Sequence, residues 1–366
     1  MKKWLLSLCM VLALAACKDE KKEEVQANAK PVIKIGAILP LTGSQADMGE
    51  AAKAGMYKAI DEQDKSSLHY DYQFVFEDNQ AKLASMPAIA NKMIMQDNVD
   101  AIGMITSAMA RVVAPIADQK GKVLYAYSIE EENYPAFGKY TFIQGISTEA
   151  IADKLIHLFR NDKLDNISVF AENIGVLGSL TSYLDKKLSQ IGIKYEINTF
   201  NPGEIDFRIA LEKSKSKGFT NFFEVGFPPE RDIIIKQMGE AGISNQNIYS
   251  FSLDLGKSSV AYEGMKTVSY NQGTVDFIKS IQQKYNIDNV YGSAAFYDFV
   301  NIVVEACENL YKNGQNITAE EITTYIHNKK QYKCASGECL VNPNGFILNQ
   351  PIVRLYEGDD WKEIEE

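Results

Sequence analysis

Hydrophobic and polar positions along the chain follow two alternating patterns. Short apolar runs such as "VIKIGAIL" predict buried strands, and aromatic residues at 70, 72, 74 and 76 have the period of two that is typical of a strand. Longer segments with helical spacing follow most of these runs. The predicted strands are 32–39, 70–78, 99–105, 122–128, 166–171, 193–200, 219–226 and 247–252. The predicted helices are 49–64, 85–96, 107–120, 149–160, 177–190, 206–217, 229–241, 275–285 and 294–311.

This strand–helix rhythm runs twice along the chain, with a restart near residue 149. Alternation of this kind is typical of α/β folds with parallel sheets, and about 335 residues are too many for one ordinary core. We therefore expect two parallel-sheet lobes. The last two helices, 275–285 and 294–311, have no strands of their own, so we expect them to return and cover the first sheet.

The first seventeen residues have the features of an export signal. Lys2 and Lys3 precede the apolar stretch 4–16, which is too short for an ordinary membrane span. The stretch ends in Leu-Ala-Ala-Cys, which resembles a bacterial lipobox and makes Cys17 the expected lipidated N-terminus. A plain signal peptide with a chance cysteine is the alternative.

Residues 18–31 are expected to form a flexible tether, because they are charged and almost without apolar side chains. Fourteen residues reach at most about 45–50 Å. We expect an exported protein that is held at the cell envelope by lipid, on the periplasmic face or the outer cell surface.

Charge excludes one class of partner. Without Lys2 and Lys3, the chain has 36 basic and 48 acidic side chains, which gives a net charge of about −12. Nucleic-acid binding needs a basic face, so no nucleic acid is expected as a partner.

Of the remaining cysteines, Cys334 and Cys339 are close enough in "CASGEC" for a disulfide-closed turn. Cys307 lies in the helical stretch "FVNIVVEACENL", and we expect it to be an ordinary buried thiol.

Enzyme motifs are missing from the sequence. It has no G-x-G-x-x-G after a strand, no phosphate-binding G-x-x-x-x-G-K-[ST] and no G-x-S-x-G nucleophile motif. His69, His157 and His327 lack metal-ligand spacing. We therefore expect no cofactor, no metal and no catalytic residues.

The segment "AIGMITSAMARVVAP", residues 101–115, contains a strand-to-helix corner of the kind at which open sheets place ligands. Thr106 and Ser107 end the apolar run. A serine that opens a helix caps it when its oxygen accepts a backbone N–H two or three residues on. It also helps free N–H groups to hold an anionic ligand atom. The local sequence leaves both roles open for Ser107.

Several segments, in order, resemble type I periplasmic binding proteins of the leucine/isoleucine/valine-binding family. They include "VIKIGAILPLTGSQADMGEAAKAGMYKAIDE", "VGFPPERDIIIKQMGEAGI" and "YGSAAFYDFVNIVVEACENL". The resemblance implies two Rossmann-like lobes joined by three crossings, near 145–148, 268–271 and 341–346. It assigns 32–146 plus 271–343 to lobe 1 and 147–270 plus 344–366 to lobe 2, with the solute bound between them.

The resemblance also implies site residues in lobe 1. Ser107 falls where relatives use a serine hydroxyl on the ligand carboxylate, with Thr106 beside it, and Ser128 falls where a backbone group contacts the same end. Glu130 replaces a threonine that helps to hold the ligand ammonium. Glu130 either binds that ammonium or points into solvent as part of the run 130–132.

The lobe walls depart from the family pattern. Met48, Val176 and Phe227 stand where leucine-binding relatives have tyrosines, and we expect Met48 and Val176 to be wall residues rather than specific contacts. Asp254 is the acid nearest to the family's ammonium-binding carboxylate, and it either fills that role or caps the next helix. A more apolar pocket follows, for a small carboxylate or amino-acid-like solute.

Three functions are compatible with these features. The leading one is the solute receptor of an ABC importer, a monomer that delivers its ligand to a permease and ATPase complex. The alternative is a sensory receptor of the same fold that signals to a membrane partner. An exported Rossmann-like enzyme is the third, and the missing nucleotide motifs weigh against it.

Overall fold

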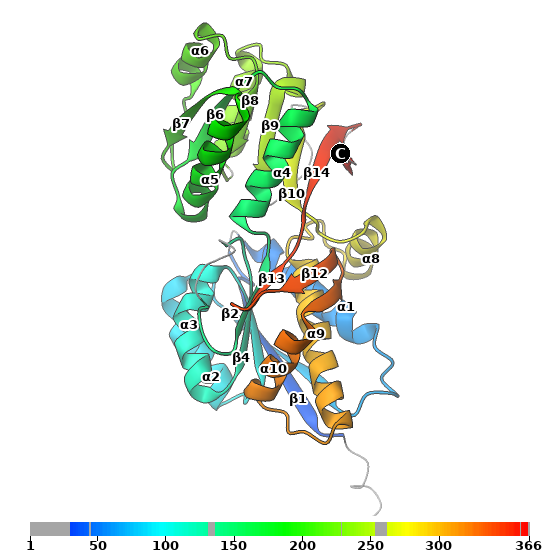
Figure 1. Ribbon diagram of the computed structural model, residues 1–366. Helices are drawn as coiled ribbons and strands as arrows, with labels where there is room; N and C mark the ends of the chain where they lie inside the picture. Colours follow the sequence, from blue (N-terminus) through cyan, green and yellow to red (C-terminus); the bar gives the residue numbers. More distant parts are fainter. Residues whose placement is uncertain are drawn as a thin grey trace, which may run out of the picture.

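The computed structural model describes residues 30–43, 45–130, 136–227, 229–252, 262–358 and 360–364. Two lobes lie one above the other, each a central sheet with helices on both faces, and the crossing segments lie at the waist (Figure 1). The predicted α/β class and the two mostly parallel sheets are confirmed. None of the helices in these ranges is long and apolar enough to cross a membrane.

Lobe 1 is built on an eight-stranded sheet of order β11-β12-β13-β5-β4-β3-β1-β2. Its strands are β1 (Val32–Leu39), β2 (Asp71–Asp78), β3 (Ala101–Ile105), β4 (Val123–Tyr127), β5 (Thr141–Gly145), β11 (Gln331–Cys334), β12 (Gly337–Val341) and β13 (Phe346–Leu348). Its helices are α1 (Ala46–Asp61), α2 (Met86–Met95), α3 (Ser107–Lys120), α8 (Val275–Tyr285), α9 (Ser293–Lys312) and α10 (Ala319–Lys329), with a 3-10 turn at Leu83–Ser85.

Lobe 2 is built on a seven-stranded sheet of order β15-β14-β10-β9-β8-β6-β7. Its strands are β6 (Asn166–Glu172), β7 (Lys194–Phe200), β8 (Phe222–Val225), β9 (Ile248–Ser252), β10 (Lys266–Tyr270), β14 (Pro351–Glu357) and β15 (Asp360–Glu363). Its helices are α4 (Thr148–Asn161), α5 (Gly175–Ile191), α6 (Arg208–Ser216) and α7 (Glu230–Glu240), with a 3-10 turn at Asn245–Asn247.

The two sheets share the order of five parallel strands. Five parallel strands have the order β2-β1-β3-β4-β5 in lobe 1 and β7-β6-β8-β9-β10 in lobe 2. In each lobe the second strand (β2 or β7) is at one edge of this order, and the third to fifth strands are added on the other side of the first strand (β1 or β6). This is the doubly wound arrangement that binds ligands where the order reverses.

Helix α9 covers the first sheet, as its lack of a strand predicted. It packs so closely on α1 that a Cβ at Gly55 would lie 2.0 Å from the Ser293 carbonyl oxygen. Phe296 and Phe299 of α9 are fully buried, and either ring would collide with a Cβ at Gly103 of β3. The prediction is confirmed for the helix 294–311. α8 instead lies against α1 and α9, where the Phe277 ring is 5.2 Å from the Tyr297 ring.

Three crossings join the lobes, at 146–147 between β5 and α4, at 271–274 between β10 and α8, and at 349–350 between β13 and β14. The first lies where it was expected, and the second overlaps its expected range only at residue 271. The expected third crossing, 341–346, is wrong because β13 pairs in parallel with β5 in the first sheet. Residues 346–348, expected in lobe 2, therefore belong to the sheet of lobe 1.

Candidate functional site

The parallel strands of both lobes end at the waist. β5 runs directly into the first crossing and β10 into the second, and their parallel neighbours end on the same side. The strand order reverses between β1 and β3 in lobe 1, and between β6 and β8 in lobe 2. Ligands of open α/β sheets bind at these reversal points, outside the carboxyl ends of the strands. The two reversal points therefore face each other across the waist.

Most of the residues selected from the sequence follow these strand ends. In chain order they are Met48 after β1, Thr106 and Ser107 after β3, Ser128 and Glu130 after β4, Val176 after β6 and Phe227 after β8. The topology thus brings residues from 48 to 227 to one level of the molecule. Asp254 and Cys17 lie outside the described residues.

The cap of α3 is Thr106 rather than Ser107. The Thr106 hydroxyl oxygen accepts a hydrogen bond from the Met109 backbone N–H at 3.4 Å. Ser107, the first helical residue, is half-buried, and its hydroxyl has no hydrogen-bond partner among the described residues. The first backbone N–H groups of a helix have no intrahelical partner. Because the Met109 N–H is bonded to Thr106, the Ser107 hydroxyl and the N–H groups of Ser107 and Ala108 are the donors that remain available to an anionic ligand atom.

Thr106 adopts a strained backbone conformation. Its φ is 77° and its ψ is 137°, in a region that β-branched residues rarely occupy. The Thr106 N–H donates to the Tyr127 carbonyl oxygen at the end of β4, 3.0 Å away, which holds the corner in place. Such strain costs about 1–3 kcal/mol and concentrates at functional sites, where the surrounding structure maintains it.

Glu130 does not point into solvent. Its side chain is largely buried, and one carboxylate oxygen lies 2.9 Å from a guanidinium nitrogen of Arg111. Of the two alternatives for Glu130, the one that places its side chain in solvent is therefore wrong, and Arg111 compensates the buried charge. The Arg111 guanidinium also lies 4.2 Å from the centre of the Phe137 ring, a cation–π distance.

Sequence reasoning missed Arg111, although its spacing gave a signal. Arg111 follows Ser107 by four residues, so both side chains lie on the same face of α3. Their shared face places a positive charge on the side of the helix where Ser107 presents its hydroxyl.

The three positions at which the resemblance implies tyrosines in leucine-binding relatives are half-buried. Met48 lies in the first turn of α1, Val176 in the first turn of α5, and Phe227 in the loop after β8. All three side chains pack against the hydrophobic core. Their partial burial fits the wall role expected for Met48 and Val176.

Two buried carboxyl groups in lobe 2 were not predicted. Glu172, at the end of β6, accepts a hydrogen bond from the Phe227 backbone N–H at 2.9 Å and so holds the loop that carries this ring. Glu224 of β8 is fully buried, and neither carboxyl oxygen has a hydrogen-bond partner among the described residues. Burial raises the pKa of both groups, well above its usual value for Glu224.

An aromatic cluster at the second crossing was missed as well. The Tyr127 ring of β4 lies 5.1 Å from that of Tyr270 in β10 and 5.2 Å from that of Tyr291, which precedes α9. Gln272 in the crossing donates to the Tyr127 hydroxyl at 3.4 Å and accepts from the Gly292 N–H. These contacts join residues 127 to 292, so no local pattern reveals them.

Other candidate sites in the described ranges have structural explanations. A hollow of about 610 Å³ lies at the end of lobe 2 that is away from the waist. Its lining includes Asp162, which precedes β6, and Lys266, which begins β10, and their side chains form an ion pair at 2.5 Å. Asp298, Cys334 and Cys339 have ligand atoms within 4.8 Å of one another, but both sulfur atoms are joined in a disulfide. The hollow is far from the waist, and the bonded sulfur atoms leave no thiolate for a metal.

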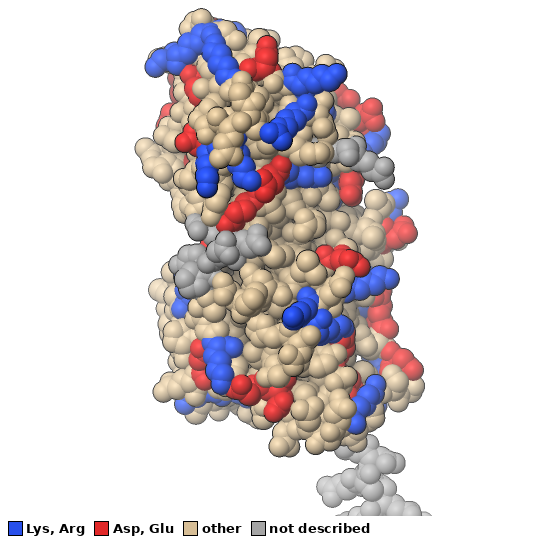
Figure 2. Space-filling view, viewed as in Figure 1, with Lys and Arg blue, Asp and Glu red and all other residues tan. Residues whose placement is uncertain are grey.

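Charged side chains of both signs are interspersed over both lobes on the face shown in Figure 2.

The Cys307 thiol is buried in α9, as expected, and burial raises its pKa.

Comparisons with known proteins agree with this geometry. A family model described as periplasmic binding protein matches residues 32–356. Leu/Ile/Val-binding protein homolog 3 of Brucella melitensis is 21% identical over 348 residues, which cover 90% of this chain and 92% of that protein. The leucine-, isoleucine-, valine-, threonine- and alanine-binding protein of Pseudomonas aeruginosa is 23% identical over 250 residues, 64% of this chain and 66% of that protein.

Solved structures share the fold. A branched-chain amino acid ABC transporter ligand-binding protein from Burkholderia xenovorans matches with a TM-score of 0.80 at 15% identity, over 91% of this chain and 94% of that one. An ABC transporter solute-binding protein from Rhodopseudomonas palustris, in complex with 3,4-dihydroxybenzoic acid, matches with a TM-score of 0.74 at 17% identity, over 91% and 95%. At these identities the likeness concerns the fold.

Proposed function

Because the chain belongs to the periplasmic binding protein family, whose members bind solutes and are not enzymes, we propose that it is the extracytoplasmic receptor of an ABC importer. In this role it binds a small solute between the lobes and delivers it to the permease. The observation that carries the proposal is the free Ser107 hydroxyl at the start of α3, beside the strained cap residue Thr106 and at a strand-order reversal.

The proposed solute is a small carboxylate or amino-acid-like molecule. A carboxylate fits the chemistry of the α3 terminus, because a hydroxyl and free N–H groups are hydrogen-bond donors at the positive end of the helix dipole. The charge of Arg111, on the same helix face, is paired with Glu130, so the hydroxyl and the N–H groups make the proposed anchor. Relatives named for amino acids and a structural neighbour bound to a dihydroxybenzoic acid are both carboxylate binders, which supports this class.

The remaining residues have proposed roles around that anchor. Ser128 contributes backbone groups, and Met48, Val176 and Phe227 form apolar walls. Asp254 is the proposed carboxylate for a solute ammonium. Glu130 is proposed to hold the Arg111 side chain in position near the ligand, because its carboxylate is already paired with that guanidinium.

A ligand screen tests the proposal. The mature protein is purified without added solute, its copurifying small molecules are identified by mass spectrometry, and amino acids, benzoates and sugars are compared by calorimetry. We expect binding within the carboxylate classes and no measurable binding of neutral sugars, which need many polar wall groups. Tight binding of a neutral sugar alone would contradict the proposed carboxylate anchor.

We also propose that the protein is anchored by lipid at Cys17, with 18–31 as the tether. The lipobox-like Leu-Ala-Ala-Cys motif supports this. Cys17→Ser is expected to release or misprocess the protein, as measured by membrane fractionation and by the mass of the N-terminal peptide. Lys22→Gln, in the tether, leaves both the signal and the motif intact and serves as the control. Membrane association unchanged in Cys17→Ser would contradict lipid anchoring.

A further inference from the structure

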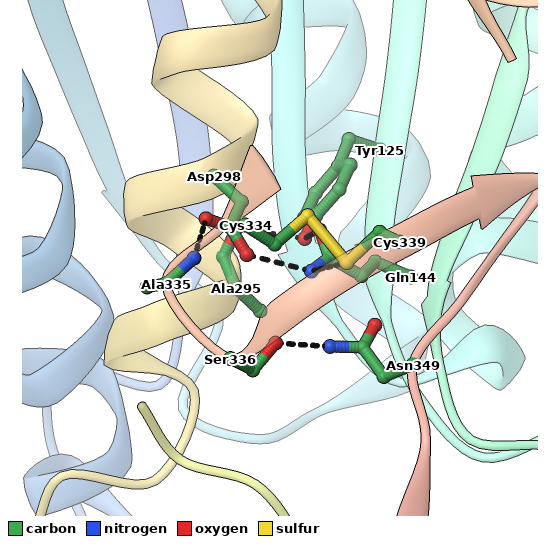
Figure 3. The surroundings of a disulfide bond; sticks show 9 residues. All are labelled: Tyr125, Gln144, Ala295, Asp298, Cys334, Ala335, Ser336, Cys339 and Asn349. Atoms are coloured by element: carbon green, nitrogen blue, oxygen red, sulfur yellow. Dashed lines mark hydrogen bonds between the residues drawn. A yellow bond between two sulfur atoms is a disulfide. The ribbon is translucent and has the colours of Figure 1, made fainter. Parts of the chain in front are cut away.

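A disulfide-closed turn lies against the third crossing. Cys334 ends β11, Cys339 lies in β12, and the bond between them closes the turn of this hairpin. Both cysteines are buried, with Cys339 fully so. Figure 3 shows the turn beside Asn349, the first residue of the third crossing.

The tip of the turn is hydrogen-bonded to that crossing. The Asn349 side-chain amide donates to the Ser336 hydroxyl in the turn (Figure 3). The Asn349 backbone N–H donates to the Gly145 carbonyl oxygen at 2.7 Å, where β5 runs into the first crossing. Ser336 and Asn349 thus connect the hairpin to two of the three crossings.

The other half of the turn is fixed to the core of lobe 1. The Ala335 backbone N–H donates to one carboxyl oxygen of Asp298 in α9 at 2.7 Å. The Gln144 side-chain amide donates to the other oxygen at 2.8 Å, and its carbonyl oxygen accepts from the Tyr125 hydroxyl at 2.7 Å. Gln144 directly precedes Gly145, so this buried network ends at the first crossing.

Space at the first crossing is also limited. A Cβ at Gly145 would lie 1.7 Å from the Ser128 carbonyl oxygen, so the backbone of β5 packs directly on the segment after β4. A displacement of Gly145 is therefore transmitted to Ser128, one of the proposed ligand-contact residues.

We propose that the Cys334–Cys339 turn is a clamp that positions the first and third crossings for solute binding. The disulfide holds Ala335 and Ser336 in the geometry that binds Asp298 on one side and Asn349 on the other. An ordered hinge loses less conformational freedom when the lobes close, so the clamp increases affinity. This inference rests on the proposed solute-binding function.

Hydrogen exchange of the solute-free protein tests the clamp directly. In Ser336→Ala, which keeps the disulfide, we expect exchange in a peptide covering 346–352 to increase at least about threefold. In Cys334→Ala/Cys339→Ala we expect at least about tenfold there. Ser66→Ala is the matched control, because its hydroxyl donates to Asp64 in an exposed turn of lobe 1. Faster exchange confined to 331–341 would overturn the proposal.

Affinity measurements on the same variants test the functional consequence. We expect the solute identified with the wild-type protein to bind about three- to tenfold more weakly to Ser336→Ala, with a melting temperature close to wild type. A disulfide that only stabilises lobe 1 would lower the melting temperature of the cysteine variant and leave the affinity of both variants unchanged, which would overturn the clamp. If the wild-type protein binds no solute, the proposed function fails, and the exchange measurement still decides whether the crossings are clamped.

Discussion

At the residue scale, the roles of Thr106 and Ser107 are separated by one position. The sequence predicted a polar strand-to-helix corner, but it left open whether Ser107 caps the helix or faces a ligand. The structure gives the cap to Thr106, which accepts the Met109 N–H. The hydroxyl of Ser107 is thereby left without a structural task in the described part of the chain.

This separation makes a sharp prediction for Ser107→Ala. Losing a hydrogen bond to a charged group costs about 1.5–3 kcal/mol, so solute affinity should fall roughly ten- to a hundredfold. Stability should change little, because the cap is intact. Thr106→Ala should instead lose about 1 kcal/mol of unfolding free energy. Calorimetry and thermal melting on both variants check this. The assignment fails if Ser107→Ala melts early with unchanged affinity.

Asp298 gives a second prediction at this scale. Burial raises the pKa of its carboxyl to about 7, and hydrogen bonds from Ala335 and Gln144 only partly oppose this. Between about pH 4 and pH 7 the folded protein keeps a proton that the unfolded chain has lost. The contribution of Asp298 to stability is therefore complete below about pH 4 and is lost as the pH rises through 7, by at most about 4 kcal/mol.

Asp298→Asn should remove this pH dependence. The asparagine oxygen can accept from Ala335, and its amide can donate to Gln144 after the Gln144 amide rotates. Gln144 would then donate to the Tyr125 hydroxyl oxygen, and the single Tyr125 O–H would donate to the Ala295 carbonyl oxygen. Urea unfolding at pH 4.5 and 7.5 measures the effect, as the difference between wild type and variant. We expect the free energy of unfolding of the variant, relative to that of the wild type, to be higher at pH 7.5 than at pH 4.5. Parallel curves of unfolding free energy against pH for the two proteins would contradict the assignment.

At the element scale, the sequence predicted strands with strong periodicity and missed short ones that depend on distant partners. The bounds of β1 and α8 agree residue for residue with the prediction. The five residues of β5 are all buried, so they show no alternation, and the strand was missed. β13 has three residues and pairs with β5 about two hundred positions earlier. Its absence from the prediction is what misplaced the third crossing.

The same limit applies to the candidate site. Ser107, Met48, Val176 and Phe227 follow strands at the two order reversals, so strand ends and resemblance were enough to select them. The pair of Arg111 with Glu130 depends on how α3 lies beside the segment after β4, which no local pattern gives. Networks such as Asp298 with Gln144 join residues more than 150 positions apart, and only the tertiary fold brings them together.

At the scale of the whole molecule, two lobes whose five central parallel strands have the same order face each other and are joined by three adjacent crossings. Hydrogen bonds between Thr148 and Glu130, and between Asn349 and Gly145, lie at these crossings. A rotation about them changes few backbone angles and leaves the two sheets intact. Hinge closure around a ligand is the motion this architecture favours.

Closure predicts a smaller radius of gyration when solute is bound, measured by small-angle scattering at saturating solute. Because the solute binds only the folded protein, it should also add stability as the logarithm of concentration over Kd, about 2.7 kcal/mol at a hundred times Kd. Ser107→Ala, at a solute concentration below its own Kd, is the control and should keep the solute-free radius. If the two radii are identical while calorimetry confirms occupancy, the lobes do not close. The stabilisation would then report binding to a rigid cleft, and the crossings would serve only to connect the lobes.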